Sequence, residues 1–172
     1  MLKNTCKSSA RRTLPAHETG HHLTYRLSCD TYEQMLADTE QCCEICGTHA
    51  RKNPGGKLYI DHDYGLGNWA VRGLLCNYCN TLIGDRPGWH LPAHLDATPY
   101  LTNPWYARRL AELGRTPHGP AEPKNGSLVV DYRGRIWGRT GSGWRQAPGR
   151  GRIISWALLV TWSGPISLTV LH

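Results

Sequence analysis

The hydrophobic and polar positions of this chain change their pattern several times, and each pattern is short. Asp30–Glu33 has the form of a capping box, in which two polar side chains satisfy the first amide groups of a helix. That helix is predicted to run to about Glu40, with a semi-apolar face made of Tyr32, Met35, Leu36 and Thr39. A second helix of about ten residues is predicted between Asn103-Pro104, a favourable start, and Gly114, a favourable stop.

Between these helices the pattern is typical of short strands. Lys57–Ile60 is β-prone and ends abruptly on the polar sequence Asp61-His62-Asp63, whereas Val71–Leu75 is apolar and strand-like. A short helix is expected to begin around Cys76 to Asn80 and to end near Gly84. The sequence therefore predicts two strands followed by a helix in the middle of the chain.

The last third of the chain favours β structure. Leu128–Trp137, with Arg133-Gly134 at its turn, predicts a hairpin, and the terminal runs Ile153–Trp162 and Ile166–Leu171 are predicted as two strands joined by a turn. The uninterrupted apolar part of that end is about ten residues, well short of the roughly 20 that cross a bilayer. No membrane association is expected.

Composition supports a loop-rich α+β protein with a small core. The 172 residues include 19 glycines and 11 prolines but no phenylalanine, and 40% of the residues are hydrophobic. A core of this size gains from a metal staple. The formal charge is +7, and the basic residues concentrate at Lys3–Arg26 and Arg133–Arg152. Such asymmetry indicates a partner that carries phosphates, with a solubilising surface as the alternative.

Seven cysteines require an explanation. The N-terminus has no apolar segment typical of a secretory signal, so a reducing, cytoplasmic location is expected, where paired cysteines favour metal binding over disulfides. Cys43/Cys46 and Cys76/Cys79 form two C-x-x-C pairs, which together complete a closed tetrahedral shell for a structural zinc ion. Cys42 competes with Cys43 as a ligand, and a redox pair or buried thiols are the alternatives to zinc.

The segment between and just after the two pairs carries candidate chemistry. Asp61 and Asn80 offer hard oxygen ligands for Mg²⁺, and a neutral His62 beside them can take a proton from an attacking water. Such a metal would stabilise charge on a phosphate and on the leaving oxygen. The alternatives are a turn in which the carboxylates accept bonds from backbone amides, and an Asn80 that caps the helix.

The strings C-E-I-C, L-Y-I-D-H-D and V-R-G-L-L-C-N-Y-C-N resemble the phage recombination endonuclease VII family of His-Me finger (HNH-like, ββα-metal) nucleases. The resemblance covers roughly residues 23–85. It implies a β-hairpin followed by a helix, a structural zinc on four cysteines, and cleavage of branched or otherwise distorted DNA that depends on Mg²⁺ or Mn²⁺. A phage origin, and thus a host cytoplasm, is implied in the same way.

Carried over by position, the resemblance makes Asp61 and Asn80 the Mg²⁺ ligands and His62 the general base. Arg72 lies in the matched string and is predicted to contact a phosphate or to pair with Asp63. The family commonly has D-H-D-H, and Tyr64 stands here at the fourth position. Tyr64 can donate a hydrogen bond to a phosphate but carries no positive charge, which slows catalysis or leaves the role to a neighbour such as His49.

We therefore expect four regions: a basic, flexible arm (1–28), a zinc-stapled ββα-metal module with a leading helix (29–86), a helical connector (87–115) and a basic, tryptophan-containing, β-rich extension (116–172). In the extension, arginines interleave with Trp137 and Trp144, which stack on bases or form the core of a small β unit. The predicted function is a metal-dependent DNA endonuclease, and the family resemblance adds a homodimer and the resolution of Holliday junctions as expectations. The alternatives are a catalytically inactive zinc ribbon that binds nucleic acid, and a zinc-held interaction scaffold.

Overall fold

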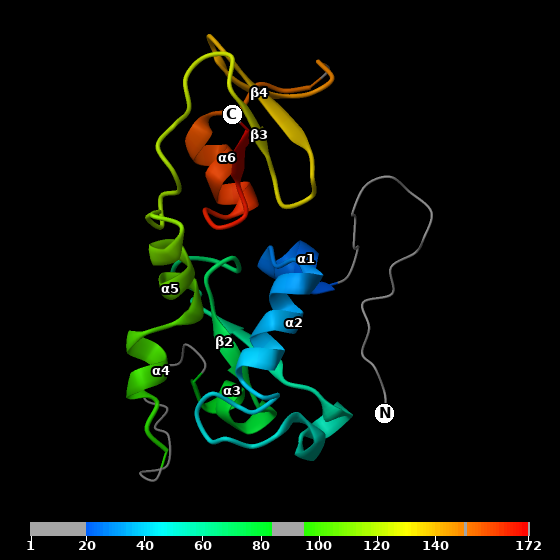
Figure 1. The fold of residues 1–172 in the computed structure, drawn as a ribbon, viewed down its shortest axis with the longest axis vertical. Helices are drawn as coiled ribbons and strands as arrows, with labels where there is room; N and C mark the ends of the chain where they lie inside the picture. The colour runs from blue at the N-terminus through cyan, green and yellow to red at the C-terminus, as the bar shows by residue number, and fades with distance from the viewer. Residues whose placement is uncertain (1–19, 84–94, 150, 172) are drawn as a thin grey trace. The chain divides into compact units, whose positions relative to one another are not determined.

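The computed structural model describes residues 20–83, 95–149 and 151–171 (Figure 1). The chain forms two compact units. One unit is Asp30–Arg109, and the other combines Leu110–His172 with the N-terminal segment that ends at Cys29. Most of the predicted N-terminal arm lies outside the described residues, but its end forms a helix, α1 (Gly20–Tyr25).

The unit Asp30–Arg109 contains the two strands and the helix that were predicted in the middle of the chain. Its elements, in order, are α2 (Cys29–Asp38), η1 (Ala50–Lys52), η2 (Pro54–Gly56), β1 (Tyr59–His62), β2 (Val71–Leu75), α3 (Asn77–Ile83), α4 (Thr98–Thr102) and the greater part of α5 (Trp105–Glu112). The predictions for α2, β2, α3 and α5 are confirmed to within two residues at each end. β1 begins and ends two residues later than predicted and therefore includes Asp61 and His62.

A β-hairpin forms the centre of this unit. β1 and β2 are antiparallel, with Tyr59 opposite Leu75 and Asp61 opposite Gly73. The register then shifts, because His62 lies opposite Val71, so Arg72 is the extra residue of a β-bulge. β2 is almost completely buried, and Leu74 and Leu75 have no exposed surface, which explains why its sequence is apolar apart from Arg72 rather than alternating. Both strands pack against α3.

The other unit is a small antiparallel sheet with one covering helix. Its strands are β3 (Leu128–Val130), β4 (Ile136–Thr140), β5 (Gly143–Gln146) and β6 (Thr169–Leu171), in the order β5-β4-β3-β6. The predicted hairpin is confirmed by the pairing of β3 with β4. The buried core of this unit consists of Val129, Trp137, Trp144, Ile154, Leu159, Val160 and Leu168.

The prediction of a strand over Ile153–Trp162 is wrong, because most of this run forms helix α6 (Trp156–Ser163). The Ser155 hydroxyl caps the helix by accepting a hydrogen bond from the Leu158 amide at 3.2 Å. The periodicity of a short, continuously apolar run is the same for a buried helix and a buried strand. Here the capping serine favours the helix. Of the predicted strand Ile166–Leu171, only the last three residues form β6.

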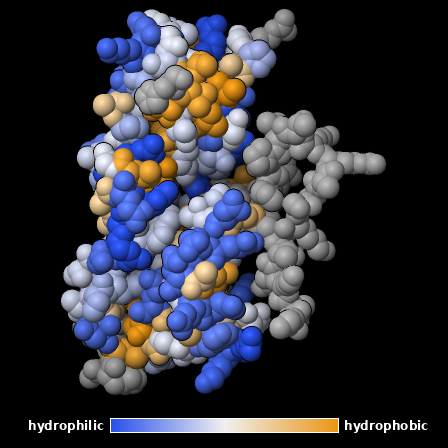
Figure 2. Space-filling view, viewed as in Figure 1, coloured by the Kyte–Doolittle hydropathy of each residue, from blue (hydrophilic) through white to orange (hydrophobic). Residues whose placement is uncertain are grey.

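The two tryptophans of the C-terminal extension belong to its core. Trp137 and Trp144 are 4% and 0% exposed, so neither presents a ring to a base, and the alternative of a β unit with a tryptophan core is confirmed. The Trp137 indole donates to the buried Asp131 carboxylate at 3.0 Å, and the Arg135 side chain donates to the same oxygen at 2.6 Å. On the face shown in Figure 2 the surface is largely hydrophilic, with smaller hydrophobic patches. No described helix is long and apolar enough to cross a membrane.

Candidate functional site

Four cysteine sulfurs converge in the unit Asp30–Arg109. The sulfur atoms of Cys43, Cys46, Cys76 and Cys79 all lie within 4.8 Å of one another. A tetrahedral zinc ion with Zn–S bonds of about 2.3 Å separates its sulfurs by about 3.8 Å, so small side-chain adjustments complete the shell. The group therefore fits a structural zinc ion, and the predicted pairing of the two C-x-x-C motifs is confirmed as a cluster that can bind metal.

Local backbone geometry explains why each pair points inward. In the first pair, the Gly47 amide donates to the Cys43 carbonyl at 2.9 Å, and Gly47 adopts a positive φ of 67°, which glycine permits without strain. In the second pair, Cys76 immediately precedes α3, and the Cys79 amide donates to the Cys76 sulfur at 3.4 Å. Cys42 is not part of the cluster, because its thiol is directed to the Glu40 carbonyl at 3.5 Å.

The protonation of these thiols differs from one to the next. Burial opposes ionisation of Cys46, but hydrogen bonds with Thr48, Cys43 and Cys76 outweigh it and lower the pKa of Cys46 to about 7. Burial raises the pKa of Cys76 and of Cys79, and Cys46 and Cys43 add to the effect in both cases, although hydrogen bonds with Cys79 partly offset it at Cys76. Several thiolates cannot lie so close together without a cation, which is the charge that a zinc ion supplies.

Asn53 links the loop between the two cysteine pairs to the start of α3 by hydrogen bonds. Its side-chain oxygen accepts a hydrogen bond from the Asn77 amide at 3.0 Å, and its side-chain nitrogen donates to the Lys57 carbonyl. Asn53 is only 8% exposed. The sequence alone does not predict this role, since nothing in the local pattern shows which helix a distant asparagine caps.

Asp61 is a buried carboxylate with three hydrogen bonds. It is 4% exposed, and Arg72 binds it with two parallel bonds, from Nε to Oδ2 at 2.8 Å and from an η nitrogen to Oδ1 at 3.0 Å. The β-bulge at Arg72 accompanies this pairing. Arg72 thus pairs with Asp61 rather than with Asp63, and its contact with a phosphate stays a prediction.

The turn that was an alternative role for the Asp-His-Asp sequence is formed by Asp63 alone. Its Oδ1 accepts hydrogen bonds from the amides of Gly65 at 2.9 Å and Leu66 at 3.3 Å. Asp61 bonds to side chains instead, so the two carboxylates of this sequence have separate tasks.

Tyr100 completes the surroundings of Asp61. Its hydroxyl donates to Asp61 Oδ2 at 2.6 Å, from helix α4, and the residue is 6% exposed. Burial raises the pKa of Tyr100, and the nearby Asp61 carboxylate adds to the effect. The sequence does not predict this contact, because 39 positions separate Tyr100 from Asp61 and no motif links them.

His62 and Tyr64 follow Asp61 in the chain, and their rings pack against each other. His62 is 8% exposed at the end of β1, and its ring centroid lies 4.2 Å from that of Tyr64, with 38° between the planes. Tyr64 is 61% exposed and therefore covers the imidazole from the solvent side.

Asn80 lies within α3 rather than at its start. It is the fourth residue of the helix, and its amide donates to the Cys76 carbonyl at 3.0 Å, so the alternative of a capping asparagine is wrong. Its half-buried side chain makes no hydrogen bond to another residue in the described parts of the chain. α3 packs against both strands of the hairpin, which brings Asn80 and Asp61 into neighbouring elements.

The model of the recombination endonuclease VII family matches residues 18–103. The chain belongs to this family. Comparisons with curated proteins and with solved structures gave no match. Membership of the family implies a nuclease that acts on DNA, and the matched range contains the four cysteines together with Asp61, His62, Asn80 and Tyr100.

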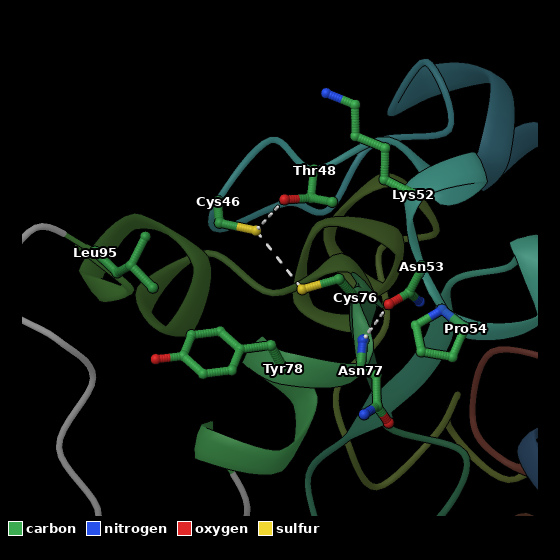
Figure 3. Close-up of a pocket in the computed structure, with 9 residues that line it drawn as sticks. All are labelled: Cys46, Thr48, Lys52, Asn53, Pro54, Cys76, Asn77, Tyr78 and Leu95. Atoms are coloured by element: carbon green, nitrogen blue, oxygen red, sulfur yellow. Dashed lines mark hydrogen bonds between the residues drawn. The ribbon is translucent and has the colours of Figure 1, made fainter.

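A cavity of about 460 Å³ lies in this endonuclease VII-like unit (Figure 3). Its walls include the zinc-site residues Cys46 and Cys76, with the exposed ring of Tyr78 and the side chain of Lys52 at its edge. Neither Asp61 nor His62 contributes to the lining. The cavity therefore belongs to the surroundings of the cysteine cluster, and the candidate catalytic residues lie outside it.

Proposed function

We propose that this protein is a metal-dependent DNA endonuclease that hydrolyses phosphodiester bonds, with β1, β2 and α3 as a ββα-metal module of the His-Me finger type. The observation that carries the proposal is the buried Asp61 carboxylate, which directly precedes His62 in β1 and is held in one orientation by Arg72 and Tyr100. A carboxylate buried at this cost in desolvation is typical of a functional site.

The residues present fit a magnesium or manganese ion. Asp61 Oδ1 accepts one side-chain hydrogen bond, and the Asn80 side chain makes none to another described residue, so both can offer a hard oxygen ligand. When bound, the ion would stabilise negative charge on the phosphate and on the leaving oxygen. Arg72 and Tyr100 keep the carboxylate in place, and α3 carries the asparagine.

His62 is the proposed general base. Its imidazole can accept the proton of a water that attacks the phosphorus, because a neutral histidine exchanges protons near pH 7. Burial under the Tyr64 ring limits its rotation, which favours one orientation for proton transfer. The zinc ion has a separate task, since four cysteine ligands leave no open position for substrate and restrict it to stabilising the fold.

Charge supports DNA as the partner and indicates where it is held. Residues 30–109 contain seven Lys and Arg against nine Asp and Glu, a net charge of −2, whereas the rest of the chain has 13 against four, a net charge of +9. We propose that the basic unit supplies much of the attraction to phosphates. A preference for branched DNA and a homodimeric state are further parts of this proposal, and they rest on the family.

The direct test is nicking of supercoiled plasmid by zinc-loaded protein, with and without Mg²⁺ or Mn²⁺. We expect cleavage that requires the added ion and falls by at least about 100-fold in His62→Ala, the scale of a lost general base. Parallel assays on a four-way junction and on a linear duplex of the same sequence measure structural preference. If the wild type binds these DNAs but cleaves none of them, the protein is a catalytically inactive zinc module that binds nucleic acid.

A further inference from the structure

Tyr100 reaches Asp61 from outside the proposed ββα module. It lies on α4, which begins 15 residues after the end of α3 and packs against β2. The 2.6 Å bond between its hydroxyl and Asp61 Oδ2 is fully buried in the protein. A buried tyrosine hydroxyl requires a hydrogen-bond partner. It remains to be explained why this partner is the candidate metal ligand.

Gly73 allows this approach. It lies directly opposite Asp61 in the hairpin, and a Cβ atom added to it would lie 2.9 Å from a carbon of the Tyr100 ring. A methyl group would therefore push the ring away from the strand. The glycine lets the ring pack against β2 beside the carboxylate, which fixes the position of the hydroxyl.

The hydrogen bonds are distributed unequally over the Asp61 carboxylate. Oδ2 accepts two of them, from Arg72 Nε at 2.8 Å and from Tyr100 at 2.6 Å. Oδ1 accepts only one, from the second Arg72 nitrogen at 3.0 Å. Each carboxylate oxygen has two lone-pair sites, so Oδ2 is saturated by these two donors while Oδ1 retains one site.

We propose that Tyr100 is a positioning residue for the catalytic metal, and that it directs Asp61 to offer Oδ1 to a divalent cation. The inference rests on the proposed function. Arg72 orients the carboxylate too, but its positive charge opposes a cation at the same group. Tyr100 fixes the orientation with a neutral donor and leaves the negative charge available. The nuclease site therefore includes α4.

The test compares Tyr100→Phe with Tyr59→Phe, both in zinc-loaded protein. Tyr100→Phe keeps the ring that packs over Gly73 and removes only the hydroxyl, so the fold is expected to persist. Tyr59 lies on β1 and contacts Lys57 by its ring, which makes it a control for the loss of a phenol elsewhere in the same unit. Circular dichroism and one zinc per chain establish that each variant is folded.

Manganese binding without DNA is the first measurement, by calorimetry or electron paramagnetic resonance. We expect Tyr100→Phe to weaken it by about 10-fold, as loss of an outer hydrogen bond to a metal ligand typically does, and Tyr59→Phe to leave it unchanged. The nicking rate should require correspondingly more Mg²⁺ for half-saturation and recover at saturating Mg²⁺. Unchanged manganese affinity and unchanged Mg²⁺ dependence in folded Tyr100→Phe would overturn the inference.

Asp61→Asn separates this inference from the proposed function. If Asp61→Asn nicks plasmid as the wild type does, Asp61 is not a required metal ligand and this inference fails, while the endonuclease activity itself stands; a wild type that cleaves no DNA would instead remove the proposed function. If Asp61→Asn is inactive while Tyr100→Phe binds manganese normally, the proposed function survives and only the role of Tyr100 is lost.

Discussion

The Glu44 carboxylate occupies the space in which a side chain at Gly73 would lie. Glu44 belongs to the first cysteine pair, Cys43-Glu-Ile-Cys46, and it bonds twice to β2. Its amide donates to the Leu74 carbonyl at 3.1 Å, and its carboxylate accepts from the Leu74 amide at 2.7 Å. The zinc site is thus joined to the hairpin by backbone and side-chain bonds at one residue, and the missing side chain of Gly73 makes room for the second of them.

This relationship predicts the effect of Gly73→Ala. The added methyl group would overlap the Glu44 carboxylate and press on the Tyr100 ring, so we expect a loss of about 1–3 kcal/mol in the free energy of unfolding. Urea denaturation followed by circular dichroism measures the change. Gly141→Ala is the matched control, because a Cβ at Gly141 meets no atom within 4 Å. Equal stability of the two variants would show that β2 and Glu44 adjust without cost.

Zinc is expected to be essential for the fold of the unit Asp30–Arg109. Cys76→Ser removes one of four converging sulfurs, so it should abolish stoichiometric zinc and with it the cooperative unfolding of this unit. Metal analysis and thermal denaturation provide the measurements. Cys42→Ser controls for the loss of a neighbouring thiol outside the cluster and should retain one zinc per chain. Zinc loss in both variants would point to a different ligand set.

Asn53→Ala should destabilise the junction between the loop and α3. The Asn77 amide would lose its acceptor, and removal of a capping side chain costs about 0.5–2 kcal/mol. Chemical denaturation of zinc-loaded protein tests this expectation. Asn125→Ala changes an exposed asparagine in the other unit and should leave the free energy of unfolding within about 0.5 kcal/mol of wild type. A similarly small effect at Asn53 would mean that water replaces the cap.

The sequence was informative where chemistry depends on local spacing. Two residues between cysteines direct both sulfurs to one side, so the cluster of four followed from the motifs alone. Val71–Leu75 was recognised as a strand because most of its residues are apolar, as in a buried strand. The same property led to the error at Trp156–Ser163, where an apolar run forms a helix whose start is set by the hydroxyl of Ser155.

The hydrogen-bond partners of Asp61 could not be predicted from the sequence, for a different reason. Arg72 reaches it because of a bulge in the hairpin, and Tyr100 because a later helix packs over a glycine on the neighbouring strand. Both contacts depend on register and on packing between elements, which short motifs do not encode. The same holds for Asn53, whose task as a cap depends on the path of the loop between the two cysteine pairs.

The basic unit should govern the affinity for DNA. Arg133 and Arg152 are exposed and form no ion pair with a carboxylate among the described residues, whereas Arg139 is neutralised by Glu122 at 3.1 Å. Replacing both exposed arginines by alanine should weaken DNA binding and lower the slope of log K against log salt by about two, roughly 0.9 for each phosphate contact.

Fluorescence anisotropy with a labelled duplex at several salt concentrations provides this measurement, in buffer without divalent ions so that no cleavage occurs. Arg51→Ala is the control, because Arg51 is an exposed arginine in the unit with a net charge of −2. Its slope should change by less than that of the double variant. If Arg51→Ala has the larger effect, DNA is held mainly by the metal-binding unit, and the charge of the C-terminal extension serves another purpose.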